Sequence, residues 1–312
     1  TSHAFRSATN LISTAFDSQL LSWDLNPAPR PEPLGCDLAV IAVPKPQFAD
    51  RGRLALIQTH TGGTNAFTLV RCPELSMVRR ILGHFIGLTP DGGDMFYRST
   101  RGSVIRESIA TGRIHSDTPT PMEATPYPDR INATATLFGR KDAQDNVVIF
   151  TLPGLQPIAT NSRGTWAFDF APDAKTVLLA TSSNIVAWDP ATHLERPLID
   201  TYSEELAFSP GGTDMAIGSW DNMVRLVNLS SPATPILLNG HQGGVVALDF
   251  SPDGKTLASA AEDKTIRLWN LRTQRQVACL RRQETAYWLR FTPDGRGLMA
   301  GSTSQAELLD AR

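Results

Sequence analysis

Residues 240–270 read GHQGGVVALDFSPDGKTLASAAEDKTIRLWN, and this stretch predicts the fold. Apolar residues alternate along 246–250 and again along 256–260, with the period of two that is typical of a half-buried β-strand. Between them stands Ser251-Pro252-Asp253-Gly254. Pro presets φ, Asp bonds its own backbone and Gly accepts a positive φ, so the tetrapeptide predicts a tight turn. The whole stretch therefore predicts strand, turn, strand.

Both features of this stretch recur along the chain. Copies of the turn occupy residues 89–92, 127–130, 171–174, 209–212, 251–254 and 292–295. The second feature is an apolar strand that ends in Trp-Asp or Trp-Asn, and it occurs at Trp23, Trp188 and Trp269. Weaker copies of this anchor place other residues at the Trp position: Val70, Glu107, Phe150, Val227 and Leu309. The eight anchors lie 37 to 47 residues apart. A period of about 40–45 residues with short strands is typical of a four-stranded propeller blade.

The stretch 240–270 resembles a WD repeat almost position for position, and the resemblance is strongest over residues 164–312. It implies an all-β fold, a β-propeller of four-stranded antiparallel blades that forms a single domain over 1–312. Eight anchors favour eight blades, and seven blades are the alternative. The last unit ends just after its third strand, so either closure is imperfect or other residues complete the edge. The expected units are about 1–33, 34–75, 76–113, 114–155, 156–194, 195–233, 234–276 and 277–312.

The resemblance also implies a structural hydrogen-bonded set in each regular blade. Here His241, Ser259, Asp263 and Trp269 match the four positions of that set. A buried carboxylate and imidazole need such partners, because their desolvation would otherwise cost several kcal/mol. We interpret the four residues as a structural tetrad rather than as the triad of a hydrolase. Units two to five lack the set, and we expect their blades to rest on apolar packing alone.

Composition and motifs exclude several classes of function. The chain has 312 residues, of which 41% are hydrophobic and 19% charged, as in a folded globular protein. Lys and Arg total 29 against 31 Asp and Glu, which argues against a strongly basic nucleic-acid binder. The odd, scattered set Cys36, Cys72 and Cys279 favours a chain without a disulfide framework, and we expect a cytoplasmic location. No apolar run approaches the ~20 residues that span a bilayer, so we expect no membrane partner.

The sequence offers no set of residues for chemistry. The six His are isolated from one another and from the Cys, and no phosphate-cradling loop occurs. We therefore expect neither a metal nor a cofactor, and no catalytic residues. The protein is predicted not to be an enzyme.

Surface recognition remains, and the propeller geometry indicates where it would take place. The residue before the Asp of a strand-two to strand-three turn points to one face, which we call the top face. The start of each inner strand lies at the mouth of the channel on the same face. Candidate protein-binding residues from these positions and the adjoining loops are Phe16, Trp220, Glu262, Trp166, Glu204, Tyr287, Arg163, Arg281 and Arg282. Aromatic and Arg side chains with a few acids are typical of an interaction hot spot.

The leading hypothesis is a non-enzymatic scaffold that binds a protein or peptide through the top face. Glu204 and Glu262 suggest a partner with at least one basic residue. We expect a monomeric propeller, which could be part of a larger chain. One alternative is a regulatory or sensory domain of a larger multidomain protein, such as a bacterial signalling protein. A lesser alternative is small-molecule binding or catalysis in the central channel, which would need convergent polar groups there.

Overall fold

The structure is a computed structural model, and the regular elements among the residues that it describes are all β-strands. It describes residues 3–7, 10–14, 20–24, 47–49, 53–61, 64–71, 76–119, 130–152, 154–165, 167–203, 205–302 and 306–310. Its strands are short and joined by tight turns, as the alternating apolar runs and the Pro-Asp-Gly turns predict.

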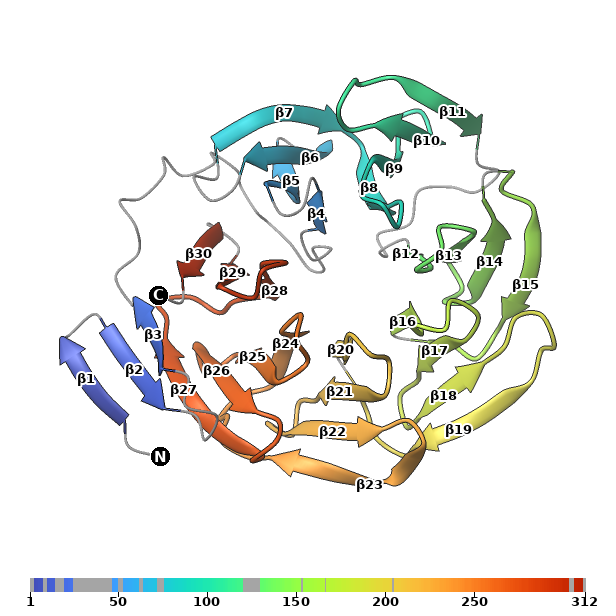
Figure 1. Ribbon diagram of the computed structural model, residues 1–312. Coiled ribbons are helices and arrows are strands. Elements are labelled where there is room, and N and C mark those ends of the chain that lie inside the picture. The colour runs from blue at the N-terminus through green and yellow to red at the C-terminus, as the bar shows by residue number, and fades with distance from the viewer. Residues whose placement is uncertain are drawn as a thin grey trace.

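Seven antiparallel sheets stand around a common centre, so the protein is a seven-bladed propeller (Figure 1). In each sheet the first strand lies nearest the centre, and consecutive strands pair outward. The first three blades are β4 (Gln47–Ala49), β5 (Leu54–Thr61), β6 (Thr64–Arg71) and β7 (Ser76–Leu82); β8 (His84–Leu88), β9 (Asp94–Arg98), β10 (Ser103–Ser108) and β11 (Ile114–Pro119); and β12 (Arg130–Ile131), β13 (Leu137–Lys141), β14 (Val147–Thr151) and β15 (Pro157–Asn161).

The other four blades contain the most regular repeats. They are β16 (Ala167–Phe170), β17 (Val177–Ala180), β18 (Ile185–Trp188) and β19 (Glu195–Ile199); β20 (Glu205–Phe208), β21 (Asp214–Gly218), β22 (Val224–Asn228) and β23 (Ser231–Leu238); β24 (Val245–Phe250), β25 (Thr256–Ala261), β26 (Thr265–Asn270) and β27 (Arg275–Arg281); and β28 (Trp288–Phe291), β29 (Gly297–Gly301) and β30 (Ala306–Asp310). Among the described residues, the last of these sheets has three strands rather than four.

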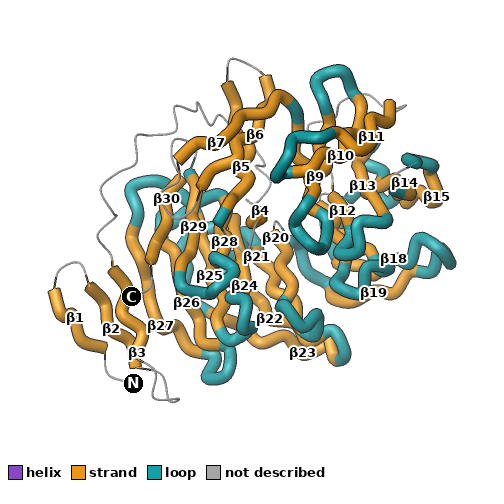
Figure 2. Tube along the Cα trace, turned by 45° about the horizontal axis from the view of Figure 1, so that its top comes forward, coloured by secondary structure: helices purple, strands orange, loops and turns teal. Residues whose placement is uncertain are grey.

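The expectation of eight blades is wrong, and the reason lies in the amino-terminal strands. β1 (His3–Ser7), β2 (Asn10–Thr14) and β3 (Leu20–Asp24) form a three-stranded sheet of their own. This sheet lies outside the ring, with β3 beside β30 (Figures 1 and 2). All eight anchors do occupy the third strand of a sheet, including Trp23 on β3. The spacing of anchors therefore counts sheets, whereas packing between sheets decides which of them join the ring.

The sequence repeat and the blade are offset by one strand. The Trp anchor ends the third strand, and the strand that follows it is the outer strand of the same blade. A unit such as 195–233 therefore begins with the outer strand β19 of one blade and goes on into β20–β22 of the next. Units of this kind link neighbouring blades covalently.

The tight turns on the face opposite the top also contact one another. In the turn at 251–254, the Gly254 N–H donates to the Ser251 carbonyl at 2.8 Å, and the Ser251 hydroxyl donates to Asp253 at 2.7 Å. Gly254 has a φ of 69°, where a side chain would be strained. The corresponding Gly212 has a φ of 68°, and a Cβ there would lie 2.9 Å from the ring of Pro172 on the preceding blade.

Apolar clusters hold neighbouring blades together. Six clusters of described residues fill the six interfaces from β4–β7 around to β28–β30. In one of them Trp269 packs with Val224, Leu226 and Leu238 of the blade before it. Described residues outside these six clusters are buried as well, among them Trp288 and Met299 of the last blade and Ala55, Ala66 and Val70 of the first. On the outer strand β7, Val78 and Leu82 are about half exposed (47% and 59%).

Candidate functional site

The top face is built from two kinds of loop. Because the blades are antiparallel meanders, alternate loops emerge on opposite faces of the ring. The loops that join an outer strand to the next inner strand share the top face with the turns between second and third strands. Residues 239–244 form a loop of the first kind, and residues 219–223 and 262–264 form turns of the second kind.

Trp220 and Glu262 come together at this face through the loop before β24. The ring of Trp220 lies against Gly244, since a Cβ on that glycine would be 2.5 Å from ring atom Cε3. The Gly244 carbonyl in turn accepts a hydrogen bond of 2.9 Å from the Glu262 N–H. A Cβ on Gly243 would meet the Glu262 Cβ at 3.2 Å. Two adjacent glycines therefore let the turns of two blades close on one loop.

Trp220 and Glu262 are both exposed to solvent, whereas the neighbouring Asp221 is paired with a cation. Trp220 is 50% exposed although it is one of the largest apolar side chains, and Glu262 is exposed as well. The neighbouring Asp221 forms an ion pair with Arg225, which holds the pKa of that carboxyl below its ordinary value. The carboxylate of Glu262 makes no hydrogen bond or ion pair with any residue that the structure describes.

The same loop leads into a buried hydrogen-bonded chain. His241 Nε2 lies 2.7 Å from Ser259 Oγ, and the Trp269 Nε1–H donates to that oxygen at 2.8 Å. The other ring nitrogen, Nδ1, lies 3.1 Å from Asp263 Oδ2. That carboxylate oxygen also accepts the Gln242 N–H at 2.9 Å. The four residues that match the family set thus link the top loop to the second and third strands of the blade.

The protonation states follow from burial. Burial lowers the pKa of His241, because the charged imidazolium loses its hydration, although Asp263 acts in the opposite direction. Burial opposes ionisation of Asp263 too, but hydrogen bonds from Gln242 and Thr265 hold the pKa of Asp263 below its ordinary value. A neutral His241 with its proton on Nδ1 then donates to Asp263 and accepts from Ser259. Because the Ser259 side chain is fully buried and already accepts from Trp269, it is not placed to attack a substrate.

The comparison with known families falls on this part of the chain. Residues 234–270 match the family model described as WD domain, G-beta repeat. The match covers one unit, and the seven-bladed ring supplies the architecture that such units build. The chain is a WD-repeat β-propeller. None of the curated proteins compared with it matches.

Propellers of WD repeats generally act as scaffolds for protein interaction. In this WD-repeat β-propeller, two further candidates adjoin the Trp220–Glu262 site. The Arg282 N–H donates to the Lys264 carbonyl at 2.8 Å, so the loop with Arg281 and Arg282 lies against the turn that holds Glu262. Arg281 is exposed, whereas Arg282 forms an ion pair with Glu307. Burial lowers the pKa of Arg282.

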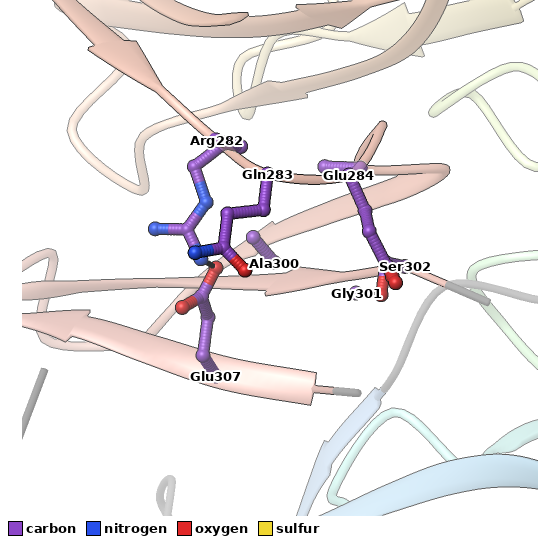
Figure 3. Close-up of a pocket in the computed structure, with 8 residues that line it drawn as sticks. Arg282, Gln283, Glu284, Ala300, Gly301, Ser302 and Glu307 are labelled. Atoms are coloured by element: carbon purple, nitrogen blue, oxygen red, sulfur yellow. Dashed lines mark ion pairs between the residues drawn. The ribbon is translucent and has the colours of Figure 1, made fainter. Parts of the chain in front are cut away.

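A small pocket lies around Arg282 at the top of the last blade of the WD-repeat β-propeller. Figure 3 shows Arg282 and Gln283 reaching toward Glu307, with Glu284 on the other side near Ser302. The free volume is about 10 Å³, which is about the space that one water needs. The pocket is too small for an organic ligand. Tyr287, 45% exposed, stands in the same loop just before β28.

The remaining candidates lie elsewhere or outside the described residues. Arg163 reaches the rim of the WD-repeat β-propeller, where it forms an ion pair with Glu195 at the start of β19. Asn161, at the end of β15, donates to the same carboxylate at 2.7 Å. These contacts join two outer strands around the rim (Figure 1). Three predicted residues lie outside the described residues: Phe16, Trp166 and Glu204.

Sequence reasoning missed a second polar network in this WD-repeat β-propeller. By strand register, Tyr97 on β9 stands where Ser259 stands on β25, and Glu107 stands where Trp269 stands. The Tyr97 hydroxyl donates to Glu107 Oε2 at 2.8 Å, and Arg79 on β7 donates to Oε1 at 2.5 Å. The expectation that this blade rests on apolar packing alone is therefore wrong. The signal was a carboxylate at an anchor position, which needs a donor once buried.

Thr265 is the other residue that the sequence analysis overlooked. Its hydroxyl donates to Asp263 Oδ1 at 2.7 Å, and its N–H donates to the same oxygen at 2.9 Å. It fixes the carboxylate that holds His241.

Residues able to hold a metal ion do not gather anywhere in the described ranges. In the same ranges, no helix is long and apolar enough to cross a bilayer.

Proposed function

We propose that this WD-repeat β-propeller is a non-enzymatic interaction module that binds a protein or peptide partner through its top face. The observation that supports the proposal is the meeting of Trp220 and Glu262 at Gly243 and Gly244. These residues come from two blades, and the loop between the blades brings them to one exposed surface.

The composition of this surface supports recognition. An exposed Trp offers a large, rigid apolar area that water releases on binding, and such side chains tend to dominate the binding energy of interfaces. The loop with Arg281 and Tyr287 extends the surface over the next blade. The partner therefore meets aromatic, acidic and basic groups within one run of loops.

We also propose a cytoplasmic location. Cys279 is a free thiol on the surface, which suits a reducing compartment.

Partner capture by paired variants tests the proposed function. Extract proteins that bind the immobilised protein would be quantified for the double variant Trp220→Ala with Glu262→Ala, and for a control with Lys255→Ala and Leu194→Ala. Lys255 and Leu194 are exposed and lie on loops of the opposite face. We expect the top variant to lose partners that the control retains, with both variants melting near the wild type. Partners that stay on the top variant and leave the control would refute the proposal.

A further inference from the structure

The hairpin that forms the outer half of blade β24–β27 carries an unbalanced positive charge. Residues 264–281, from the turn before β26 to the end of β27, hold five cations and no Asp or Glu: Lys264, Arg267, Arg272, Arg275 and Arg281. The chain as a whole has a formal net charge of -2, so this segment departs from the rest of the protein. We call residues 264–281 the basic hairpin.

The cations of the basic hairpin are not neutralised within the protein. All except Arg267 are exposed, and none of the five forms an ion pair with a residue that the structure describes. Arginines of other blades differ, for example Arg163, which pairs with Glu195. A cluster of like charges raises the local potential and attracts groups of the opposite charge.

The structural tetrad explains why Arg267 has no carboxylate partner. One blade earlier, Arg225 stands at the same position of the third strand, two residues before the anchor. Arg225 forms its ion pair with Asp221, four residues before it. The equivalent carboxylate in the basic hairpin's blade is that of Asp263, which is held by the tetrad and by Thr265. The charge of Arg267 therefore stays unbalanced.

Strand register places Arg267 and Arg281 on one face of the basic hairpin. Arg281 lies opposite Thr265, and Cys279 lies opposite Arg267. Residues opposite one another in an antiparallel pair share a face, and so do residues two apart along a strand. The two arginines and the thiol of Cys279 are therefore neighbours on the face that turns toward the preceding blade, where Trp269 packs.

Arg267 is held in place while its charge remains available. Its Nη1 donates to Gln276 on β27, and a Cβ on Gly240 would lie 2.7 Å from the same nitrogen. Gln276 is neutral, so this hydrogen bond orients the guanidinium without balancing it. The Nε of Arg267 has no hydrogen-bond partner among the described residues. An oriented guanidinium loses less freedom when it binds a carboxylate.

The dimensions of the basic hairpin favour a short acidic segment over a long polyanion. β27 has seven residues and is about 20 Å long, so an extended segment of similar length covers the basic hairpin. Beside its upper end stand Glu262 and Glu284, both exposed. A nucleic acid that ran past this end would meet their carboxylates, whereas a short segment ends before them.

We propose that the basic hairpin is a docking surface for a short acidic segment of a partner protein, with Arg267 and Arg281 as the main contacts. The inference goes beyond the proposed function, because Trp220 and Glu262 take no part in these contacts. Guanidinium groups bind carboxylates through two parallel N–H···O bonds, so Asp and Glu side chains suit this surface.

Protection of Cys279 against alkylation tests the proposal. The thiol is free and exposed, and it lies opposite Arg267, so a bound segment covers it. After reaction of the native protein, trypsin releases this thiol in the fragment 276–281, apart from the other two cysteines. The probes are Ac-Gly-Glu-Ala-Glu-Ala-Glu-Gly-NH2 and the same peptide with Gln in place of Glu. The acidic peptide is expected to slow the reaction with iodoacetamide in a saturable manner, and the Gln peptide is expected to leave the rate unchanged.

Matched removals of charge locate the contacts. Arg267→Gln and Arg281→Gln are each expected to raise the peptide concentration at half protection by about two- to fivefold, the usual effect of one exposed ion pair. Arg281 is exposed and has no ion pair, so its substitution leaves the fold intact. Arg296→Gln removes the same charge from an exposed position just before β29, and it is expected to change nothing.

Three results would overturn the docking surface. The first is equal protection by the two peptides, or none with either at millimolar concentration. The second is a half-protection concentration that stays the same in both Arg267→Gln and Arg281→Gln. The third comes from a short thymidine oligonucleotide of equal charge: protection at a lower concentration than the acidic peptide needs would assign the surface to nucleic acid and refute a protein segment.

Discussion

At the scale of single residues, the polar chain around Trp269 makes its blade depend on one side chain. Trp269 is 2% exposed, packs on the preceding blade and donates to Ser259. Trp269→Ala is expected to cost about 3–5 kcal/mol in the free energy of unfolding. Val227 stands at the same position one blade earlier and is also fully buried, but no polar group depends on it. Val227→Ala is expected to cost about 1.5 kcal/mol. Denaturant melts give both values, and equal losses would contradict the role of the tetrad.

The buried imidazole of the same chain predicts a pH dependence of stability. The pKa of His241 is lowered in the folded protein from an ordinary value of 6.5. Below pH 6.5 the unfolded chain therefore binds a proton that the folded protein resists, and stability falls as the pH falls. The thermal midpoint is expected to be lower at pH 5.5 than at pH 7.5, with a shallower dependence in His241→Gln. Parallel curves for the wild type and the variant would show that His241 is not the titrating group.

Register explains why the residues of these networks were only partly predictable. His241, Ser259, Asp263 and Trp269 carry the pattern of the family, so the sequence alone brings them together. Tyr97, Glu107 and Arg79 follow no such pattern. Their contact depends on β7 of one blade lying beside β10 of the next, and this is a tertiary relationship that periodicity does not encode.

At the scale of elements, the tight turns combine backbone conformation with contacts between blades. Gly212 has a positive φ and lies against Pro172, whereas the adjacent Gly211 has open space around it and no unusual φ. Gly212→Ala is expected to destabilise the protein by about 1–2 kcal/mol, from strain at positive φ and the close approach of the proline. Gly211→Ala is the matched control, with an expected change within about 0.5 kcal/mol. The two thermal midpoints decide the matter, and a Gly212→Ala protein as stable as the control would refute the turn analysis.

Turn residues and strand alternation made the elements predictable, because each is fixed by neighbours in the sequence. The same local pattern assigned Trp220 and Glu262 to turns and Tyr287 to a loop, where the structure has them, and their role in binding stays a prediction. The pairing of Arg163 with Glu195 on the rim, and that of Arg282 with Glu307, could not be foreseen. Both depend on where a distant strand of another sheet runs.

At the scale of the whole molecule, strand pairing distinguishes the last blade from the others. The third strand β26 is paired with both β25 and β27, whereas the third strand β30 is paired, among the described residues, with β29. Backbone amides of β30 are therefore expected to exchange with solvent faster than those of β26. Native-state hydrogen exchange by mass spectrometry measures both. Equal protection of the two strands would show that β30 is covered as well as β26.

The number of blades is the property that the sequence predicted least well. Trp23 satisfies the local requirements of an anchor as well as Trp188 does, and each ends the third strand of a sheet. Whether a sheet joins the ring depends on its contacts with other blades. The sequence around Trp23 does not indicate which sheet this strand will pack against.

Because repeat and blade are offset by one strand, the stretch of sequence that identifies the family is not a complete blade. Residues 234–270, which identify the family, hold the end of β23 and the strands β24–β26, but not the outer strand β27. A peptide of this stretch would leave the edge of β26 open and remove Val224 and Leu226 from the side of Trp269. The stretch that identifies the family is therefore not expected to fold alone, because its strands are stabilised by residues that precede it and residues that follow it.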